Sequence, residues 1–259
     1  MRELIKRTIT GLILVLLTIF LASKGGKVLS YFIFLISIIG LREFYNAVNN
    51  KNYKPIRFIG YIACIGFLLN SLGYESISLN FIISFVIITL IITFVLNEKI
   101  NLTDISITFF SIFYIPFLFQ HIIYLDGSNY IWFVFITAWG TDTFAYLVGN
   151  LFGKTKLCPD LSPNKTVEGS IGGILGSVLI TILFAKYFEI DPLWKLIVLS
   201  SLAAIIAQFG DLTASKIKRI MDIKDYGFIL PGHGGILDRF DSILFTAPFV
   251  YYFVNLFLL

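Results

Sequence analysis

The chain has 259 residues, of which 57% are hydrophobic and 14% charged, and its mean hydropathy is +0.87. An ordinary soluble domain has about a quarter charged residues, and a disordered chain has low hydrophobicity, so both classes are excluded. Two cysteines are too few for a disulfide scaffold, and a formal net charge of +4 is too small to indicate nucleic-acid binding. The composition therefore predicts an all-α, polytopic integral membrane helical bundle, because helices satisfy their own backbone groups in lipid.

Apolar stretches recur along the whole chain and predict about nine transmembrane helices. They cover residues 8–22, 28–41, 58–73, 79–96, 105–125, 130–149, 170–188, 192–208 and 241–258. A span needs roughly 20 residues, so the first two stretches are short. The 23–27 linker joins them as either a tight or a partly re-entrant hairpin. The first stretch follows a basic start, as in a signal peptide, but the poor cleavage context predicts a retained span.

The distribution of Lys and Arg predicts the orientation in the membrane. If all nine stretches span, one side carries 16 of the 20 cations and the other side carries four. The cation-rich side holds the N-terminus and the loops near 42–57, 97–104, 150–169 and 209–240. The positive-inside rule places this side in the cytoplasm and the C-terminus outside.

The first 125 residues carry few groups that suggest chemistry. His121 lies well inside the fifth stretch, where a hydrogen-bonded packing residue is expected. Arg42 and Glu43 stand at a cytoplasmic helix end, where we expect them to anchor the membrane interface. Cys64 and Cys158 have no CxxC neighbour, so both are expected to be plain thiols.

The first polar cluster of the second half centres on Asp142, about two turns inside the cytoplasmic end of the sixth stretch. An acid at a span centre costs about 2.5–3.5 kcal/mol on insertion scales. Asp142, Tyr146, Gly149 and Gly153 have the spacing of one helix face. This face is either a packing surface with one buried hydrogen bond or the setting of a functional carboxylate. Acids within spans are commonly functional, which favours the second interpretation.

The second cluster is Ser-Pro-Asn-Lys-Thr-Val-Glu-Gly at 162–169, followed by glycines at 172, 173 and 176. Ser162 before Pro163 predicts a helix start, with serine as the N-cap and proline at the first helical position. Glycines at four-residue spacing permit close helix packing in lipid. Lys165 and Glu168 are not explained by either interpretation.

The third cluster interleaves acids and bases between residues 211 and 241, with apolar stretches on both sides. If the eighth helix continues past residue 208, one of its faces carries Asp211, Ser215, Lys218 and Asp222, with Arg219 beside them. Asp238 and Asp241 stand three residues apart near the start of the last helix, where the helix dipole favours carboxylates.

This third cluster has the residue types that phosphoryl or nucleotidyl transfer requires. Carboxylates with substrate phosphates hold Mg²⁺, and Lys and Arg neutralise phosphate oxygens. The 232–235 turn lets backbone N–H groups approach an anion at a helix start. No GxxxxGK[ST] sequence is present, which excludes a P-loop enzyme. The alternative is a polybasic loop attracted to anionic lipids, but such a loop has no use for the acids.

Residues 215–241 resemble the signature of the phosphatidate cytidylyltransferases, also called CDP-diacylglycerol synthases. The stretch runs Ser-x-Ile-Lys-Arg-(four)-Lys-Asp-x-Gly-(two)-Leu-Pro-x-His-Gly-Gly-Ile-x-Asp-Arg-Phe-Asp, without departure across its 27 positions. The Asp-Thr-x-Ala-Tyr-x-x-Gly element at 142–149 and the Ser-Pro-x-Lys-Thr-x-Glu-Gly element at 162–169 are also similar to that family. The family usually has Lys where this chain has Asn164. The resemblance covers roughly 139–245.

The resemblance implies that a phosphatidic acid phosphate attacks the α-phosphate of CTP, with Mg²⁺ required, and leaves a second, monovalent cation open. It implies Asp211 and Asp238 as metal ligands. It implies a catalytic set of Asp211, Ser215, Lys218, Arg219, Lys224, Asp225, His233, Asp238, Arg239 and Asp241. Substrate binding is assigned to Asp142, Lys165, Thr166, Glu168, Gly234 and Gly235. His233 orients either a phosphate or the helix start, and no proton transfer is required of it.

The expected organisation is an embedding part, 1–125, and a catalytic part, 126–259, with cytoplasmic loops 150–169 and 209–240. The implied partners are CTP and phosphatidic acid in the cell membrane, with no nucleic acid, and small-residue faces permit a homodimer without demanding one.

One rival function is that of a CTP-using lipid kinase or a cytidylyltransferase for another lipid phosphate. Another is a transporter or channel that uses Asp142 and the 211–241 acids as coupling sites. The polar groups gather at one membrane face and no inverted repeat is visible, which argues against transport.

Overall fold

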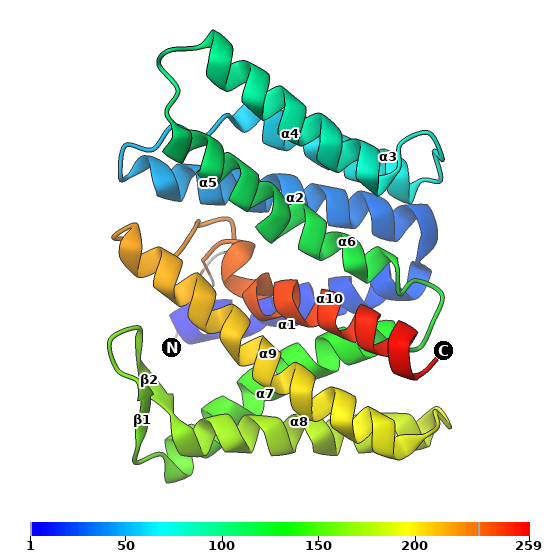
Figure 1. Ribbon diagram of the computed structural model, residues 1–259. Coiled ribbons are helices and arrows are strands. Elements are labelled where there is room, and N and C mark those ends of the chain that lie inside the picture. Colours follow the sequence, from blue (N-terminus) through cyan, green and yellow to red (C-terminus); the bar gives the residue numbers. More distant parts are fainter. Residues whose placement is uncertain (1, 231, 233) are drawn as a thin grey trace. The chain divides into compact units, whose positions relative to one another are not determined.

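The computed structural model describes residues 2–230, 232 and 234–259, with side chains from Thr10 onward. Over this part of the chain the backbone forms nine continuous helical rods and one two-stranded hairpin (Figure 1). The helices are α1 (Arg2–Lys24), α2 (Gly26–Asn49), α3 (Arg57–Ser71), α4 (Leu79–Leu96), α5 (Leu102–Ile112), α6 (Leu118–Ile123), α7 (Ile131–Phe152), α8 (Val167–Tyr187), α9 (Leu193–Ile220) and α10 (Leu237–Phe257). The π-helical turn η1 (Phe113–Phe117) joins α5 to α6, and the strands are β1 (Lys156–Cys158) and β2 (Ser162–Thr166).

Seven of the described helices are long and apolar enough to cross a membrane. These are α2, α4, the α5–α6 rod, α7, α8, α9 and α10, whereas Thr10–Lys24 and Arg57–Ser71 are shorter apolar helices. All nine predicted apolar stretches are therefore helical, and two of them fall below the length of the other seven. The chain is a polytopic integral membrane protein.

The structure divides into two compact units. The first contains the chain up to Asp126 together with Ile220–Arg239, and the second contains Gly127–Arg219 with Phe240–Leu259. Each unit has its own packing and its own polar cluster.

The core of the first unit lies where α3 and α4 pack together. Buried apolar side chains from both helices and the end of α5 meet here; they are Ile59, Ala63, Phe67, Ile82, Val86, Leu90 and Ile112. Asn101 and Asp104 form a reciprocal capping box at the start of α5. The buried Asp104 carboxylate also accepts a 2.7 Å hydrogen bond from the backbone N–H of Lys54, which ties the loop between α2 and α3 to this helix start.

The α5–α6 rod widens into the π-helical turn at Pro116 because proline cannot donate to the regular helical ladder. One turn later, His121 is buried and its Nδ1–H donates to the carbonyl oxygen of Phe117 at 3.0 Å. The ring also packs edge-on against Phe117 and Tyr124. The prediction of a hydrogen-bonded packing histidine is confirmed. Cys64 and Cys158 form no disulfide, as expected.

The second unit is built on the close approach of α7 and α8, which lie side by side (Figure 1). A Cβ atom on Gly172 would lie 2.5 Å from Cβ of Val148, and one on Gly173 would lie 2.8 Å from the carbonyl oxygen of Thr141. Only glycine fits at such distances. The prediction that these glycines permit close helix packing is confirmed.

The predicted helix start at Ser162 is wrong, because this residue lies in an antiparallel hairpin of β1 and β2. The register pairs Cys158 with Ser162 and Lys156 with Thr166. Proline lacks an N–H group, and a short two-stranded ribbon tolerates it because one edge of each strand needs no ladder bond. The N-cap of α8 is instead Thr166, whose Oγ1 accepts a 3.1 Å hydrogen bond from the N–H of Gly169.

Candidate active site

The polar face of α9 begins at Asp211. The helix continues past residue 208 to Ile220, which meets the condition set for a shared face, and therefore places Asp211, Ser215 and Lys218 on one side. Asp222 is not on this face. It follows the helix end with a φ of 55° and forms an ion pair with Lys51 in the first unit, so its assignment to the face was wrong.

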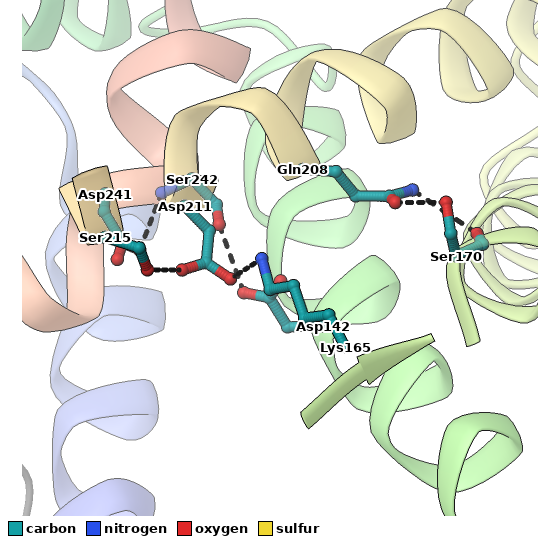
Figure 2. Close-up of polar contacts among 8 residues, drawn as sticks. All are labelled: Asp142, Lys165, Ser170, Gln208, Asp211, Ser215, Asp241 and Ser242. Carbon is teal, nitrogen blue, oxygen red and sulfur yellow. Dashed lines mark hydrogen bonds and ion pairs between the residues drawn. The ribbon is translucent and has the colours of Figure 1, made fainter. Parts of the chain in front are cut away.

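Asp211 is the centre of the contacts drawn in Figure 2. Its Oδ1 accepts a hydrogen bond of 3.4 Å from Ser215 Oγ, and its Oδ2 forms an ion pair with Lys165 of β2 (Figure 2). About a quarter of each charged side chain is exposed, 26% for Lys165 and 27% for Asp211. The hairpin thus supplies a cation to the polar face of α9.

Asp241 of α10 adds a second carboxylate, of which only 8% is exposed. It interacts electrostatically with Asp211, with Asp142 of α7 and with Lys218. Ser242 links two of the acids, because its N–H donates to Asp241 Oδ1 at 2.8 Å and its Oγ donates to Asp142 Oδ2 at 3.2 Å (Figure 2). Three helices therefore bring their acids to one place, which we call the acidic cluster: Asp142, Asp211 and Asp241.

Gly210 explains how α9 and α10 come so close at the acidic cluster. A Cβ atom at this position would lie 2.7 Å from the carbonyl oxygen of Asp241 and 3.1 Å from Cα of Ser242. Any side chain larger than hydrogen would push the two helices apart. The glycine directly before Asp211 therefore sets the spacing of the two carboxylates.

Glu168 and Thr166 organise the base of the hairpin. Glu168 accepts hydrogen bonds of 3.1 Å from the N–H groups of both Lys154 and Thr155, and its carboxylate lies in the first turn of α8, where the helix dipole favours it. Nearby, Gln208 of α9 donates through Nε2 to the carbonyl oxygen of Ser170 at 3.3 Å (Figure 2). The Glu168 bonds hold the segment before β1 at the start of α8, and the Gln208 bond joins α9 to the first turn of α8.

Most of the remaining signature residues belong to the first unit. Asp238 Oδ2 accepts hydrogen bonds from the N–H of Tyr226 at 2.8 Å and of Gly235 at 2.9 Å, which folds the segment before α10 around the carboxylate. Leu230 pairs with Gly234 across the turn. Lys224 and Arg239 are exposed, as is Arg219 in the second unit, and Asp225 is half-buried. His233 lies outside the described residues.

Sequence reasoning missed the role of two residues. Ser242 bridges the acids although it carries no charge, and its adjacency to Asp241 was the only available signal. Glu43 was assigned to the membrane interface, but only 4% of it is exposed and it accepts hydrogen bonds from the amides at the start of α10. The interface assignment was therefore wrong.

The donor set of the acidic cluster fits a magnesium ion. Within residues 10–230, 232 and 234–259, no three His, Cys, Asp or Glu side chains are arranged as a ready metal cage. Mg²⁺ does not need one, because it usually binds through one or two carboxylates, several waters and substrate phosphates. The mostly buried Asp241 faces the like charges of Asp211 and Asp142, and a cation offsets that repulsion.

Comparison with known proteins agrees with this chemistry. The sequence matches the cytidylyltransferase family over residues 5–257. It is 36% identical to the phosphatidate cytidylyltransferases of Staphylococcus saprophyticus and Staphylococcus epidermidis over 251 residues, which cover 93% of this chain and 95% of each relative. The phosphatidate cytidylyltransferase of Staphylococcus aureus is 35% identical over the same coverage. On a match that spans nearly its whole length, the chain belongs to the cytidylyltransferase family.

Proposed function

We propose that this protein transfers CMP from CTP to phosphatidic acid and releases pyrophosphate, as a phosphatidate cytidylyltransferase of phospholipid synthesis. The family match and the names of the relatives support the reaction. The observation that carries it to named residues is the acidic cluster with its cations: Lys165 against Asp211, and Lys218 near Asp241. Apart from Lys165 on β2, these groups lie on helices that are otherwise apolar, which suits a soluble nucleotide meeting a membrane lipid.

The reaction is a single displacement at phosphorus. A phosphate oxygen of phosphatidic acid forms a bond to the α-phosphorus of CTP. The bond from that phosphorus to the oxygen bridging the α- and β-phosphates breaks, and its electron pair leaves with pyrophosphate. A phosphate nucleophile is already ionised at neutral pH, so no general base is required. The residues of the site contribute by positioning the reactants and by stabilising charge on the phosphate oxygens.

The proposal assigns roles to the residues in and around the acidic cluster. Asp211 and Asp241 supply hard oxygen ligands for Mg²⁺, which when bound neutralises phosphate oxygens and draws electrons from the reacting phosphorus. Lys165 and Lys218 are held beside those carboxylates and pair with the phosphates, together with the exposed Arg219. Ser215 and Ser242 orient Asp211 and Asp142 by hydrogen bonds.

Other assignments stay predictions. The family resemblance alone supports the metal role of Asp238, the phosphate contacts of Lys224 and Arg239, and the roles of Asp225, His233, Gly234 and Gly235. The monovalent cation, the homodimer that small-residue faces permit, and the division into an embedding part, 1–125, and a catalytic part, 126–259, also stay predictions. Members of the family typically depend on a metal ion.

Nucleotide preference tests the reaction directly. Purified protein is expected to release pyrophosphate from CTP, and not from ATP, GTP or UTP, when phosphatidic acid and Mg²⁺ are both present. With CTP labelled in its cytidine, the label is expected to enter the lipid fraction. Transfer of label from the γ-phosphate of CTP would instead identify a lipid kinase. Ion movement in liposomes without CTP turnover would identify a transporter.

We further propose that the N-terminus and the large polar loops face the cytoplasm, with the two shorter helices α1 and α3 also spanning. The bias of 16 cations against four supports this orientation. A single cysteine placed in the 51–54 loop of a variant lacking Cys64 and Cys158 is expected to resist an impermeant thiol reagent added to intact cells. A single cysteine near Asp126 is expected to react. The reverse pattern of labelling would overturn the topology.

A further inference from the structure

Glu43 of α2 is buried against the signature segment that precedes α10. Its Oε1 accepts a 2.9 Å hydrogen bond from the N–H of Ile236, and its Oε2 accepts one of 2.9 Å from the N–H of Leu237. Leu237 is the first residue of α10, so the carboxylate caps this helix from outside its own sequence. The first N–H groups of a helix have no partner within it and carry the positive end of the dipole, which a carboxylate satisfies.

The backbone of the signature segment is shaped to admit this carboxylate. A Cβ atom on Gly235 would lie 2.5 Å from Cδ and from both carboxylate oxygens of Glu43, and one on Gly227 would lie 2.6 Å from Oε1. A side chain at either glycine would therefore displace the Glu43 carboxylate. Gly40, one turn before Glu43, receives Leu237 in the same way, with a would-be Cβ 3.1 Å from Leu237 Cδ2.

Glu43 and Asp238 divide the amides of this segment between them. Asp238 holds the N–H groups of Tyr226 and Gly235, and Glu43 holds the next two, of Ile236 and Leu237. The two carboxylates also repel each other electrostatically. A buried charge beside a like charge is costly, and the charge-assisted bonds to fixed amides offset that cost. Membrane anchoring alone does not require a buried carboxylate that accepts hydrogen bonds from two backbone amides.

We propose that Glu43 is a positioning residue of the transferase reaction, which fixes the start of α10 and with it the orientation of Asp238 and of the segment formed by residues 225–230 and 234–237. The proposal rests on the proposed function, because Asp238 and this segment matter to turnover only if the signature handles CTP. Glu43 itself touches no reacting atom. It acts through the backbone that presents the signature residues.

The first test measures the amides themselves by hydrogen exchange in the purified full-length protein. Glu43→Gln removes the charge and replaces one acceptor oxygen by an NH₂ group. Hydrogen bonds to a charged group are stronger than those between neutral groups, so exchange in the 234–240 peptide is expected to be about tenfold faster or more. The matched control is Asp104→Asn, which alters another buried carboxylate of the same unit that caps a different helix. This control is expected to leave the 234–240 peptide unchanged.

The second test separates positioning from loss of folded protein. The KM for CTP is independent of the fraction of active enzyme, so a merely structural role would leave it unchanged. Glu43→Gln is expected to raise the KM for CTP at least threefold and to lower kcat/KM about tenfold. Asp104→Asn is expected to lower the yield of folded protein without changing the KM.

A third variant keeps the proposal testable if Glu43→Gln does not fold. Gly235→Ala pushes the carboxylate away from its amides and is expected to reproduce the faster exchange. Combined with Glu43→Asp, which withdraws the carboxylate by one methylene, Gly235→Ala is expected to cause at most about a twofold further increase in exchange of the 234–240 peptide. The two changes are therefore non-additive, as contacting residues are.

The outcomes are distinguishable. A wild-type protein without CTP turnover overturns the proposed function, and the exchange comparison then decides on the Glu43 contacts alone. An active wild type, with Glu43→Gln equal to it in both exchange and KM, overturns the positioning role. Equal effects of Glu43→Gln and Asp104→Asn on the 234–240 peptide overturn it as well.

Discussion

Replacing Asp211 by asparagine is expected to lower the rate of CDP-diacylglycerol formation by about 10²–10³-fold, the usual cost of removing one electrostatic group that stabilises a transition state. The substitution keeps the size of the side chain but removes its charge. This charge forms the ion pair with Lys165 and interacts electrostatically with Asp241. A neutral amide is a poor ligand for Mg²⁺, and Lys165 loses the partner that holds it. The rate is measured by transfer of cytidine label into lipid at saturating CTP and phosphatidic acid.

The protein itself is expected to insert and fold normally, because Asp211 is only half-buried and its neighbour Ser215 can donate to the amide oxygen. Size-exclusion chromatography and thermal unfolding in detergent check this. Asp160→Asn makes the same charge change on an exposed turn of the hairpin and is expected to keep full activity. A rate for Asp211→Asn within twofold of the wild type at limiting Mg²⁺ would remove Asp211 from the metal site.

The parts of the fold that sequence predicted well are those that local pattern encodes. The runs of apolar residues predicted where each helical rod lies, because a helix that crosses a membrane needs a long apolar run. The face shared by Asp211, Ser215 and Lys218 was predicted on the condition that the helix continues past residue 208, and α9 continues to Ile220. Glycines at four-residue spacing predicted close helix packing, and α7 and α8 pack in this way, since no other residue lets backbones approach so closely.

The errors arose where one local pattern suits two structures. Serine followed by proline is typical of a helix start, but proline is equally compatible with the edge of a short ribbon. In the structure, Ser162 pairs with Cys158 in the β1–β2 hairpin and is therefore in a strand. A local rule for helix capping does not consider such pairing. The helix start moved to Thr166 as a consequence.

Within the site, sequence identified the residue types but not their partners. The bond from Ser242 to Asp142 joins residues 100 positions apart, and that from Ile236 to Glu43 joins residues 193 apart. No periodicity connects positions so distant. Glu43 was especially hard to recognise, because an acid near the end of a span resembles an interface anchor until its burial is known. Tertiary packing alone turns it into a helix cap.

The scarcity of charge in the sequence has a physical counterpart in the second unit. Helices α7, α8, α9 and α10 are each apolar enough to span, yet between them and the hairpin they bring three acids and two lysines together. Exposing these charges to lipid would be costly, and pairing them offsets part of that cost. The close approach of the helices is therefore needed for the site as well as for the fold, and glycine provides it.

Gly172→Ala is accordingly expected to have the largest effect on stability. The added methyl would lie 2.5 Å from Cβ and Cγ2 of Val148, so α7 and α8 must separate. Overpacking of this kind typically costs about 1–3 kcal/mol, and here no flexible side-chain end can move aside. A clear fall in the midpoint of thermal unfolding in detergent, with lower folded yield, is expected. Activity should fall with it, because α7 carries Asp142 and the segment leading into α8 carries Lys165.

A compensating change distinguishes this contact from a general intolerance of α8. Val148→Gly removes the side chain that the new methyl would meet, so Gly172→Ala with Val148→Gly is expected to recover most of the lost midpoint. The recovery will be incomplete, since glycine within a helix costs about 1 kcal/mol relative to alanine. Leu175→Ala, on the exposed face of the same helix, is expected to change the midpoint little, because 65% of that leucine is exposed. Equal losses for Gly172→Ala with and without Val148→Gly would show that the helices do not meet at this pair, and that the α7–α8 contact does not set the geometry of the site.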